Sequence, residues 1–154
     1  MSKILFLKTL LLFCFLWSCG FKVVNQSELI NFNISSISVS GDNRISFKIK
    51  NKLLQYSKNN GKKLLNLDID VKKNKEIKEK NIKNEITKFE ISIASSIQYG
   101  NNEGDQFEIT KKGDYTVTGQ YSQTLNNEKK LINVLTESLV EDVIEELIQR
   151  TNDL

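Results

Sequence analysis

Two spacings of apolar residues divide this chain into segments. Residues 30–34 alternate between apolar and polar side chains, and the alternation restarts one position out of phase at Ile37 and Val39. Strict alternation is typical of a half-buried strand, and a change of phase by one residue is typical of a β-bulge. The pattern predicts a first strand with a bulge at Ser35 and Ser36.

The segment after the turn at residues 41–43 fits two structures. Residues 45–49 alternate as in a strand, yet apolar side chains also recur every three or four positions, as on one face of a helix. That face consists of Ile45, Ile49, Leu53 and Tyr56. We favour the helix, because the spacing continues to Tyr56 and stops before the Asn-Asn-Gly sequence at 59–61.

Further strands are expected between residues 65 and 99. Residues 65–71 alternate cleanly between apolar and polar side chains and predict a half-buried strand. Residues 72–88 hold seven lysines and few apolar side chains, and we interpret them as a lysine-rich connection. Residues 89–99 place their large apolar side chains on one face of a long strand, which ends in a turn at 101–104.

The next extended segment contains a break. Residues 107–109 predict a strand, and the Lys-Lys-Gly-Asp sequence at 111–114 is interpreted as a break or hairpin tip. Alternation then continues through Tyr115 and Val117 to Tyr121, so we expect an extended chain there.

A helix is predicted from about Asn127 to Arg150. Its apolar residues recur every four positions at Leu131, Leu135, Leu139, Val143 and Leu147. The predicted order is strand, helix, strand, strand, strand, helix, which excludes a β-sandwich because the last segment is helical. We therefore expect an α+β fold: a single mixed sheet of about four strands with two helices on one face.

The first residues have the pattern of an export signal. Lys3 and Lys8 accompany an apolar run that ends in the sequence Leu-Trp-Ser-Cys at 16–19. This ending resembles a lipobox, so we expect cleavage before Cys19 and lipidation of its thiol; a plain signal peptide with an incidental cysteine is the alternative. The expected organisation is a signal peptide over 1–18, a lipidated tether over 19–29 and a single domain over 30–154.

Composition argues against several classes of function. The formal net charge is +3, and two of the lysines belong to the expected signal, so the mature chain is near neutral at +1 and no nucleic-acid partner is expected. The chain contains no histidine, no Cys–His pair, no metal-ligand cluster and no phosphate-binding glycine loop. We expect neither an enzyme nor a bound cofactor or metal.

Several short motifs, in this order, resemble those of the lipopolysaccharide-assembly lipoprotein (LptE) family of Gram-negative bacteria. They are Cys-Gly-Phe at 19–21, Asn-Arg at 43–44 before the first helix, Asp-Tyr-Thr-Val at 114–117 before Tyr-Ser at 121–122, and the closing helix. The resemblance implies a non-enzymatic lipoprotein held by its lipid on the periplasmic side of the outer membrane. It also implies a partner, the outer-membrane β-barrel that inserts lipopolysaccharide, which the lipoprotein plugs and helps to assemble. An unrelated periplasmic lipoprotein, such as a secretion-barrel pilot or a cell-wall scaffold, is the main alternative, and a lipid-anchored hydrolase is a third.

Lipopolysaccharide carries phosphates, so a contact surface should present cations. Lys111 and Lys112 are the candidate contacts, because a tight turn would hold their side chains firmly and Gly113 would let the backbone approach closely. The alternative interpretation is ordinary solvated lysine. We favour that alternative for the lysines of 72–88, whose mixed charges in a loop would have no fixed geometry.

Overall fold

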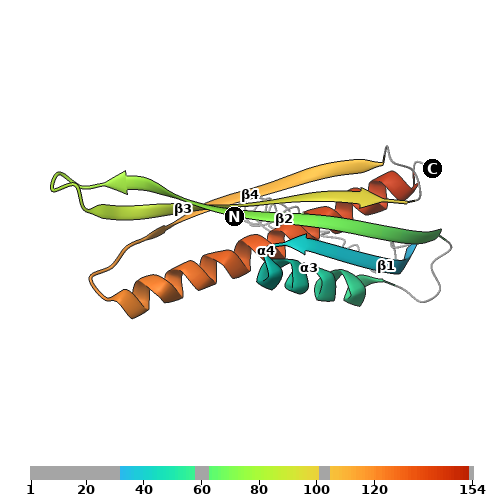
Figure 1. Cartoon of the computed structure of the whole chain (residues 1–154), viewed down its shortest axis with the longest axis horizontal. Coiled ribbons are helices and arrows are strands. Elements are labelled where there is room, and N and C mark those ends of the chain that lie inside the picture. The colour runs from blue at the N-terminus through green and yellow to red at the C-terminus, as the bar shows by residue number, and fades with distance from the viewer. Residues whose placement is uncertain (1–31, 58–62, 101–104, 153–154) are drawn as a thin grey trace, which may run out of the picture.

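The computed structural model describes residues 32–57, 63–100 and 105–152 of the chain. Its elements are β1 (Phe32–Gly41), α3 (Asn43–Tyr56), β2 (Lys63–Lys80), β3 (Ile86–Tyr99), β4 (Gln106–Thr116) and α4 (Tyr121–Asn152). The strands form one mixed sheet in the order β1-β2-β3-β4, and both helices lie on the same side of it (Figure 1). The predicted fold class and element order are confirmed.

The bulge in β1 lies at the predicted position. β1 runs parallel to β2, with Ile34 opposite Leu65 and then Ser36 opposite Asn66, so Ser35 is the additional residue. Because an extra residue reverses the side-chain alternation, Ile37 and Val39 return to the helix-covered side, where they pack against the core.

The start of α3 is determined by the residues that end β1. Gly41 has a φ of +87°, a conformation that glycine adopts readily. The next residue, Asp42, donates its backbone N–H to the Val71 carbonyl at 2.9 Å and accepts the Ile45 N–H on its side chain at 3.1 Å. This N-cap turns the chain away from the sheet into the predicted helix. β2 continues beyond Val71 with no β1 residue beside it.

The interpretation of residues 72–88 as a connection is wrong. β2 extends to Lys80, a short turn follows, and β3 begins at Ile86, so this lysine-rich segment is most of a β-hairpin. Backbone pairing with β3 continues along it, for example between Lys75 and Ile91 and between Ile77 and Phe89. The hairpin extends past the ends of β1 and α3 (Figure 1). Lysine is uncommon in strands, but here ladder hydrogen bonds and cross-strand ion pairs override that preference.

The hairpin tip predicted at residues 111–114 is also wrong. These residues lie inside β4, where Lys111 pairs with Ile93, Lys112 with Ser92 and Gly113 with Ile91. The close approach at Gly113 involves a helix rather than a turn, since a Cβ added there would lie 2.8 Å from the side chain of Leu131 in α4. The break in the apolar pattern therefore has a packing cause.

Tyr121 was expected to be extended, but it is the first residue of α4. The helix thus begins several residues before the predicted start near Asn127. Thr124 stabilises this first turn of the helix through two hydrogen bonds. Its hydroxyl accepts the Thr118 N–H at 2.9 Å, and its own N–H donates to the Gln120 carbonyl at 3.1 Å. Local hydrogen bonds, rather than an apolar stripe, therefore determine where α4 begins.

The core lies between the sheet and the two helices. Leu139 and Val143 of α4 are fully buried, as are Ile69 and Ile93 of the sheet. The opposite face of the sheet is polar over most of its length. Its side chains alternate with the core residues and include Asn66, Asp68, Asp70, Asn74, Glu76, Glu90, Ser92, Ser96, Glu108, Thr110, Lys112 and Asp114. We call this surface the open face.

Candidate functional site

The two candidate lipopolysaccharide contacts lie on opposite sides of the sheet. Lys111 is on the helix-covered side, where its ammonium group is 2.5 Å from a carboxylate oxygen of Asp142 in α4. Lys112 is on the open face, in a shallow depression of about 80 Å³ that it shares with Glu76 and Glu90. Adjacent residues of a strand point to opposite faces, so the structure does not bring these two cations together.

A network of polar and aromatic side chains joins the hairpin to the start of α4. The Lys75 ammonium group lies 2.7 Å from Glu128 and 4.4 Å from the centre of the Phe89 ring. The Tyr115 hydroxyl donates to the same Glu128 oxygen at 2.8 Å. Burial alone would raise the pKa of Glu128, but the hydrogen bonds from Lys75 and Tyr115 outweigh it, and the pKa is lowered. Glu128 is therefore held as a carboxylate.

Lys75 is the cation that pairs with the Glu128 carboxylate. Burial would lower its pKa, but the hydrogen bonds with Glu128 and Tyr115 and the charge of Glu128 together outweigh that effect, and the pKa is raised. Both partners thus stay charged at neutral pH, and neither is suited to take up or release a proton there. The network is a structural clamp rather than an acid–base pair.

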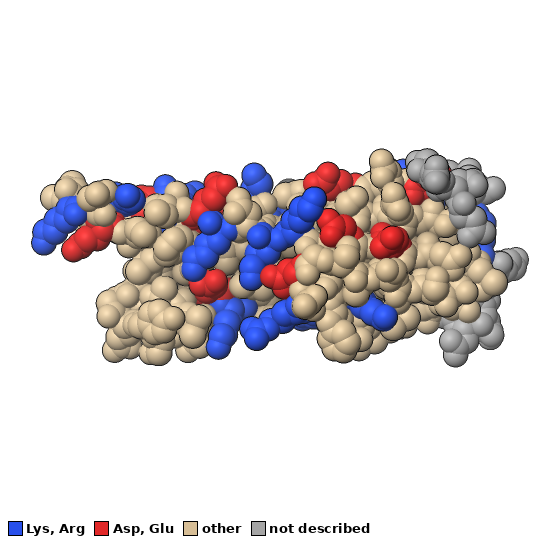
Figure 2. Space-filling model, in the orientation of Figure 1, with Lys and Arg blue, Asp and Glu red and all other residues tan. Residues whose placement is uncertain are grey.

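Next to this network is a partly apolar cleft of about 440 Å³. It lies between the hairpin and the beginning of α4, at the end of the molecule that Figure 2 shows as notched. Phe89, Val117 and Leu125 contribute apolar walls, and Tyr121 on the rim has 81% of its surface exposed.

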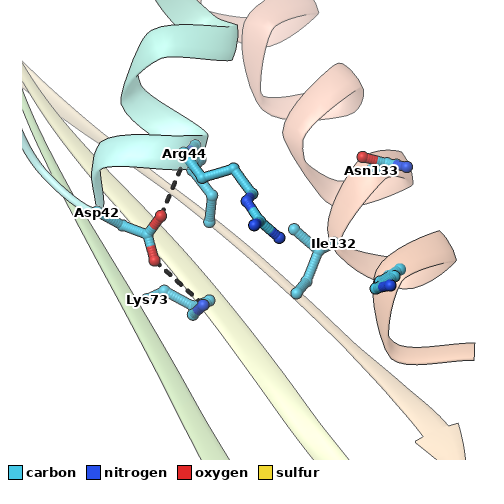
Figure 3. Close-up of a pocket in the computed structure, with 7 residues that line it drawn as sticks. Asp42, Arg44, Lys73, Ile132 and Asn133 are labelled. Carbon is cyan, nitrogen blue, oxygen red and sulfur yellow. Dashed lines mark hydrogen bonds and ion pairs between the residues drawn. The ribbon is translucent and has the colours of Figure 1, made fainter. Parts of the chain in front are cut away.

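A second cavity, of about 360 Å³, lies where the start of α3 faces α4 and β2 (Figure 3). Its lining is Asp42, Arg44 and Ile45 from the start of α3, Lys73 from β2, and Lys129, Ile132 and Asn133 from α4. We call it the basic cavity, because its lining contains three cations and one carboxylate.

The single carboxylate of the basic cavity is already engaged. Asp42 is 3.1 Å from the Lys73 ammonium group and also caps α3 through the Ile45 N–H. Burial would raise the pKa of Asp42, but these hydrogen bonds outweigh it and the pKa is lowered. Among the described residues, no ion pair neutralises Arg44 or Lys129. In Figure 3 the Arg44 side chain reaches across the cavity toward Ile132.

Sequence reasoning missed the basic cavity. Asn43 and Arg44 were singled out as a motif, yet nothing in their spacing indicated that Lys73 and Lys129 would lie opposite them. The three cations are spread over more than eighty positions, so their convergence depends on how α4 crosses the sheet. The one available signal was an arginine two residues after a helix-capping aspartate.

Other predictions from the sequence concern residues that the structure does not describe, or kinds of site that can be looked for only in the described residues. Cys19, the signal over 1–18 and the tether over 19–29 lie outside the described residues. Over the described ranges, no group of acidic, cysteine or histidine side chains is arranged to hold a metal ion. None of the helices described is both long enough and apolar enough to span a bilayer.

Comparison with known proteins identifies a shared fold. No protein-family model matches the sequence, and no curated protein matches it significantly. Among solved structures, rare lipoprotein B from Shewanella oneidensis superimposes with a TM-score of 0.50 at 11% identity, covering 76% of this chain and 96% of that one. Lipoprotein B from Nitrosomonas europaea gives a TM-score of 0.51 at 11% identity, covering 86% and 90%. At such low identity the likeness establishes the fold alone: this chain folds like these two bacterial lipoproteins over most of its described length.

Proposed function

We propose that this chain is a lipid-anchored lipoprotein of the lipopolysaccharide transport machinery. In this role it occupies the lumen of the outer-membrane β-barrel that inserts lipopolysaccharide and helps that barrel to assemble. The observation that carries the proposal is the fold, which is shared with two bacterial lipoproteins and was expected from the motifs that resemble the LptE family. The Leu-Trp-Ser-Cys ending of the apolar N-terminal run supports the anchor, with Cys19 as the acylated residue on the periplasmic side of the outer membrane.

The surface of the domain suits a water-filled lumen. The interiors of large barrels are polar, and barrels of this kind are too wide to be filled by their own side chains. On the open face, acidic and basic side chains interleave with serine, threonine and asparagine. Lysines and carboxylates are also interspersed along the side shown in Figure 2. A plug with a mixed polar surface can hydrogen-bond to a polar wall without leaving a large apolar patch in water.

The body is also elongated. The 32 residues of α4 span about 48 Å at the rise of an α-helix, and the helix runs along most of the molecule (Figure 1). A long, narrow body can lie along a barrel axis and contact the wall on several sides. A non-enzymatic role is part of the proposal, since the partly buried pair of Lys75 with Glu128 is held in its charged form.

Contact with lipopolysaccharide at Lys111 and Lys112 stays a prediction, and the geometry separates the two residues. Lys112 is the accessible member on the open face, whereas Lys111 is committed to Asp142. Lys112→Glu should therefore weaken lipopolysaccharide binding by the purified chain, and added salt should weaken the wild type. Lys111→Glu should instead lower stability through repulsion with Asp142. Unchanged binding by a folded Lys112→Glu variant would remove this residue from the contact surface.

Photocrosslinking in cells tests the plug. A photoreactive amino acid is placed at Thr110 on the open face or at Glu141 on the exposed side of α4, two positions on opposite sides of the body. A plug is surrounded by its barrel, so both positions should capture the same barrel protein. A secretion pilot or a scaffold binds by one surface, so capture from one position alone, or of a different protein, would favour those alternatives.

Depletion provides the functional readout. Loss of the chain should lower both the amount of correctly assembled barrel and the amount of lipopolysaccharide at the cell surface. Normal surface lipopolysaccharide in depleted cells would refute the role, even if crosslinks to a barrel were found.

A further inference from the structure

Several lysines on the helix-covered side of the sheet are neutralised. Lys73, Lys75 and Lys111 each contact a carboxylate at 3.1 Å or less, and Lys48 reaches Glu137 at 3.5 Å. Arg44 and Lys129 differ, because neither has an ion-pair partner in the part of the chain that the structure describes. Both line the basic cavity, so two cations without an ion-pair partner among the described residues lie together there.

We propose that the basic cavity binds a phosphate group, held by Arg44, Lys129 and Lys73 at the N-terminal end of α3. The three cations come from three different elements, α3, α4 and β2, which approach the cavity from three sides. After Asp42 is counted against them, two positive charges remain, which matches a phosphate monoester near neutral pH. This inference rests on the cavity and does not depend on the proposed function.

The donors suit a tetrahedral oxyanion. Arg44 offers a planar fork that can bind two phosphate oxygens at once, and the lysines supply point charges. Asn133 of α4 also lines the cavity, and its amide oxygen accepts a hydrogen bond from the Lys48 ammonium group at 3.1 Å. The first turn of α3 contains no acidic side chain that would occupy the site.

Nearby carboxylates do not fill the cavity. Glu137 lies one helical turn beyond Asn133 and is engaged by Lys48 and Lys52, at 3.5 and 3.9 Å. Asp42 is turned toward Lys73 and the α3 backbone, as the dashed lines of Figure 3 show. Ile45 and Ile132 line the remaining wall, and an apolar wall strengthens charge-assisted hydrogen bonds by limiting competition from water.

The phosphate can belong to a free anion or to a lipid headgroup, and the experiment separates these sources. The full-length chain, purified in non-ionic detergent, is titrated calorimetrically with inorganic phosphate. It is also titrated with phosphatidic acid in mixed micelles of the same detergent, and phosphatidylcholine micelles serve as the lipid without a phosphate monoester. Tighter binding of phosphatidic acid than of inorganic phosphate would identify a lipid-borne group, and the reverse order would identify a free anion.

Two matched double variants test the site. Arg44→Gln with Lys129→Gln removes the two unneutralised cations, and each lost charge-assisted contact should weaken phosphate binding by about tenfold. Lys80→Gln with Lys83→Gln removes the same net charge at the far end of the hairpin, and should change binding by less than about twofold. Arg44→Lys, which keeps the charge but loses the fork, should lose less affinity than Arg44→Gln.

The phosphate affinities of the two double variants decide whether the basic cavity is the binding site. All four substituted side chains are exposed, so both double variants should keep the wild-type circular dichroism spectrum and melting temperature. Equal losses of affinity in the two double variants would show attraction by bulk charge alone and overturn the proposal. Absence of binding to both phosphate probes would overturn it as well, and would leave the barrel crosslinks of the proposed function unaffected.

Discussion

Gly41 is the residue at which a single methyl group should do most damage to this fold. It adopts a φ of +87°, and a Cβ added there would lie 1.9 Å from the carbonyl oxygen of Val71. Real carbon–oxygen contacts are well over an ångström longer, so β1 and β2 would have to separate. The Asp42 N–H, which donates to that same carbonyl at 2.9 Å, would lose its partner.

Gly100 is the matched control. Its φ of +82° is almost the same, but an added Cβ would meet nothing closer than the Asp105 carboxylate at 3.6 Å. Placing alanine at a left-handed φ costs about 1–2 kcal/mol, of which about 0.4–1 kcal/mol is recovered from the unfolded chain. Gly100→Ala should therefore destabilise the domain by about 1 kcal/mol.

Gly41→Ala has the same backbone penalty and two further ones. Loss of the Asp42 hydrogen bond contributes about 1 kcal/mol, and distortion of the parallel pairing of β1 contributes at least about as much again. The total is about 3 kcal/mol or more, compared with the 5–15 kcal/mol that is typical of a whole domain. At roughly 4 °C per kcal/mol, the melting temperature should fall by about 12 °C for Gly41→Ala and by about 4 °C for Gly100→Ala.

The assay is thermal unfolding followed by circular dichroism, with urea titration to check that the m-value is unchanged. The difference between the two variants isolates the clash with Val71, because the backbone strain is common to both. Equal shifts in melting temperature for the two glycine variants would refute the reasoning. They would mean that a Cβ at residue 41 does not clash with the Val71 carbonyl.

The remaining predictions address the core, the clamp and the anchor. Leu139 is fully buried, so Leu139→Ala should lower the free energy of unfolding, measured by urea titration, by about 2–5 kcal/mol. Glu141→Ala on the exposed side of α4 should change it by less than about 0.5 kcal/mol. Equal effects of the two substitutions would mean that the helix face assigned to the core is wrong. The lowered pKa of Glu128 means that its stabilising contribution is present above the ordinary glutamate pKa of about 4.3 and is lost as the pH falls through the folded-state value. The stability difference between wild type and Glu128→Gln should therefore be constant near neutral pH and shrink in acid, and a pH-independent difference would argue against an ionised Glu128. Metabolic labelling with a palmitate analogue should mark the wild type but not Cys19→Ala, and labelling of both would exclude lipidation at this residue.

Segments with strong periodicity were predictable from the sequence, because their side chains alone distinguish buried from exposed positions. The β1 bulge follows from the change of phase between Ile34 and Ile37, and the helix at Asn43–Tyr56 follows from its four-residue spacing. The start of α4 was placed too late, since residues 121–126 are held by hydrogen bonds around Thr124 that leave no periodic trace.

The lysine-rich strands were missed because backbone pairing with β3 and ion pairs stabilise them, rather than an apolar pattern of their own. Residues 72–80 have little apolar pattern of their own, and β3 supplies the ladder that makes them a strand. Five of the seven lysines over 72–88 also find carboxylates. The pairs are Lys72 with Asp70, Lys73 with Asp42, Lys75 with Glu128, Lys78 with Glu90 and Asp114, and Lys88 with Glu79. Composition alone suggested a loop, whereas the structure shows a paired hairpin.

A related reason explains why the sequence grouped Lys111 with Lys112 and did not indicate the basic cavity. Lys111 and Lys112 are adjacent in sequence, and adjacency suggests joint action in a turn, but in a strand it places two side chains on opposite faces. Arg44, Lys73 and Lys129 are remote in sequence, yet helix crossing and strand pairing bring all three to one cavity. A cluster of charge in the sequence is therefore weak evidence for a site in this fold. Its lysines act mainly by pairing across elements, so an anion-binding surface is better sought where the tertiary structure leaves cations without carboxylates.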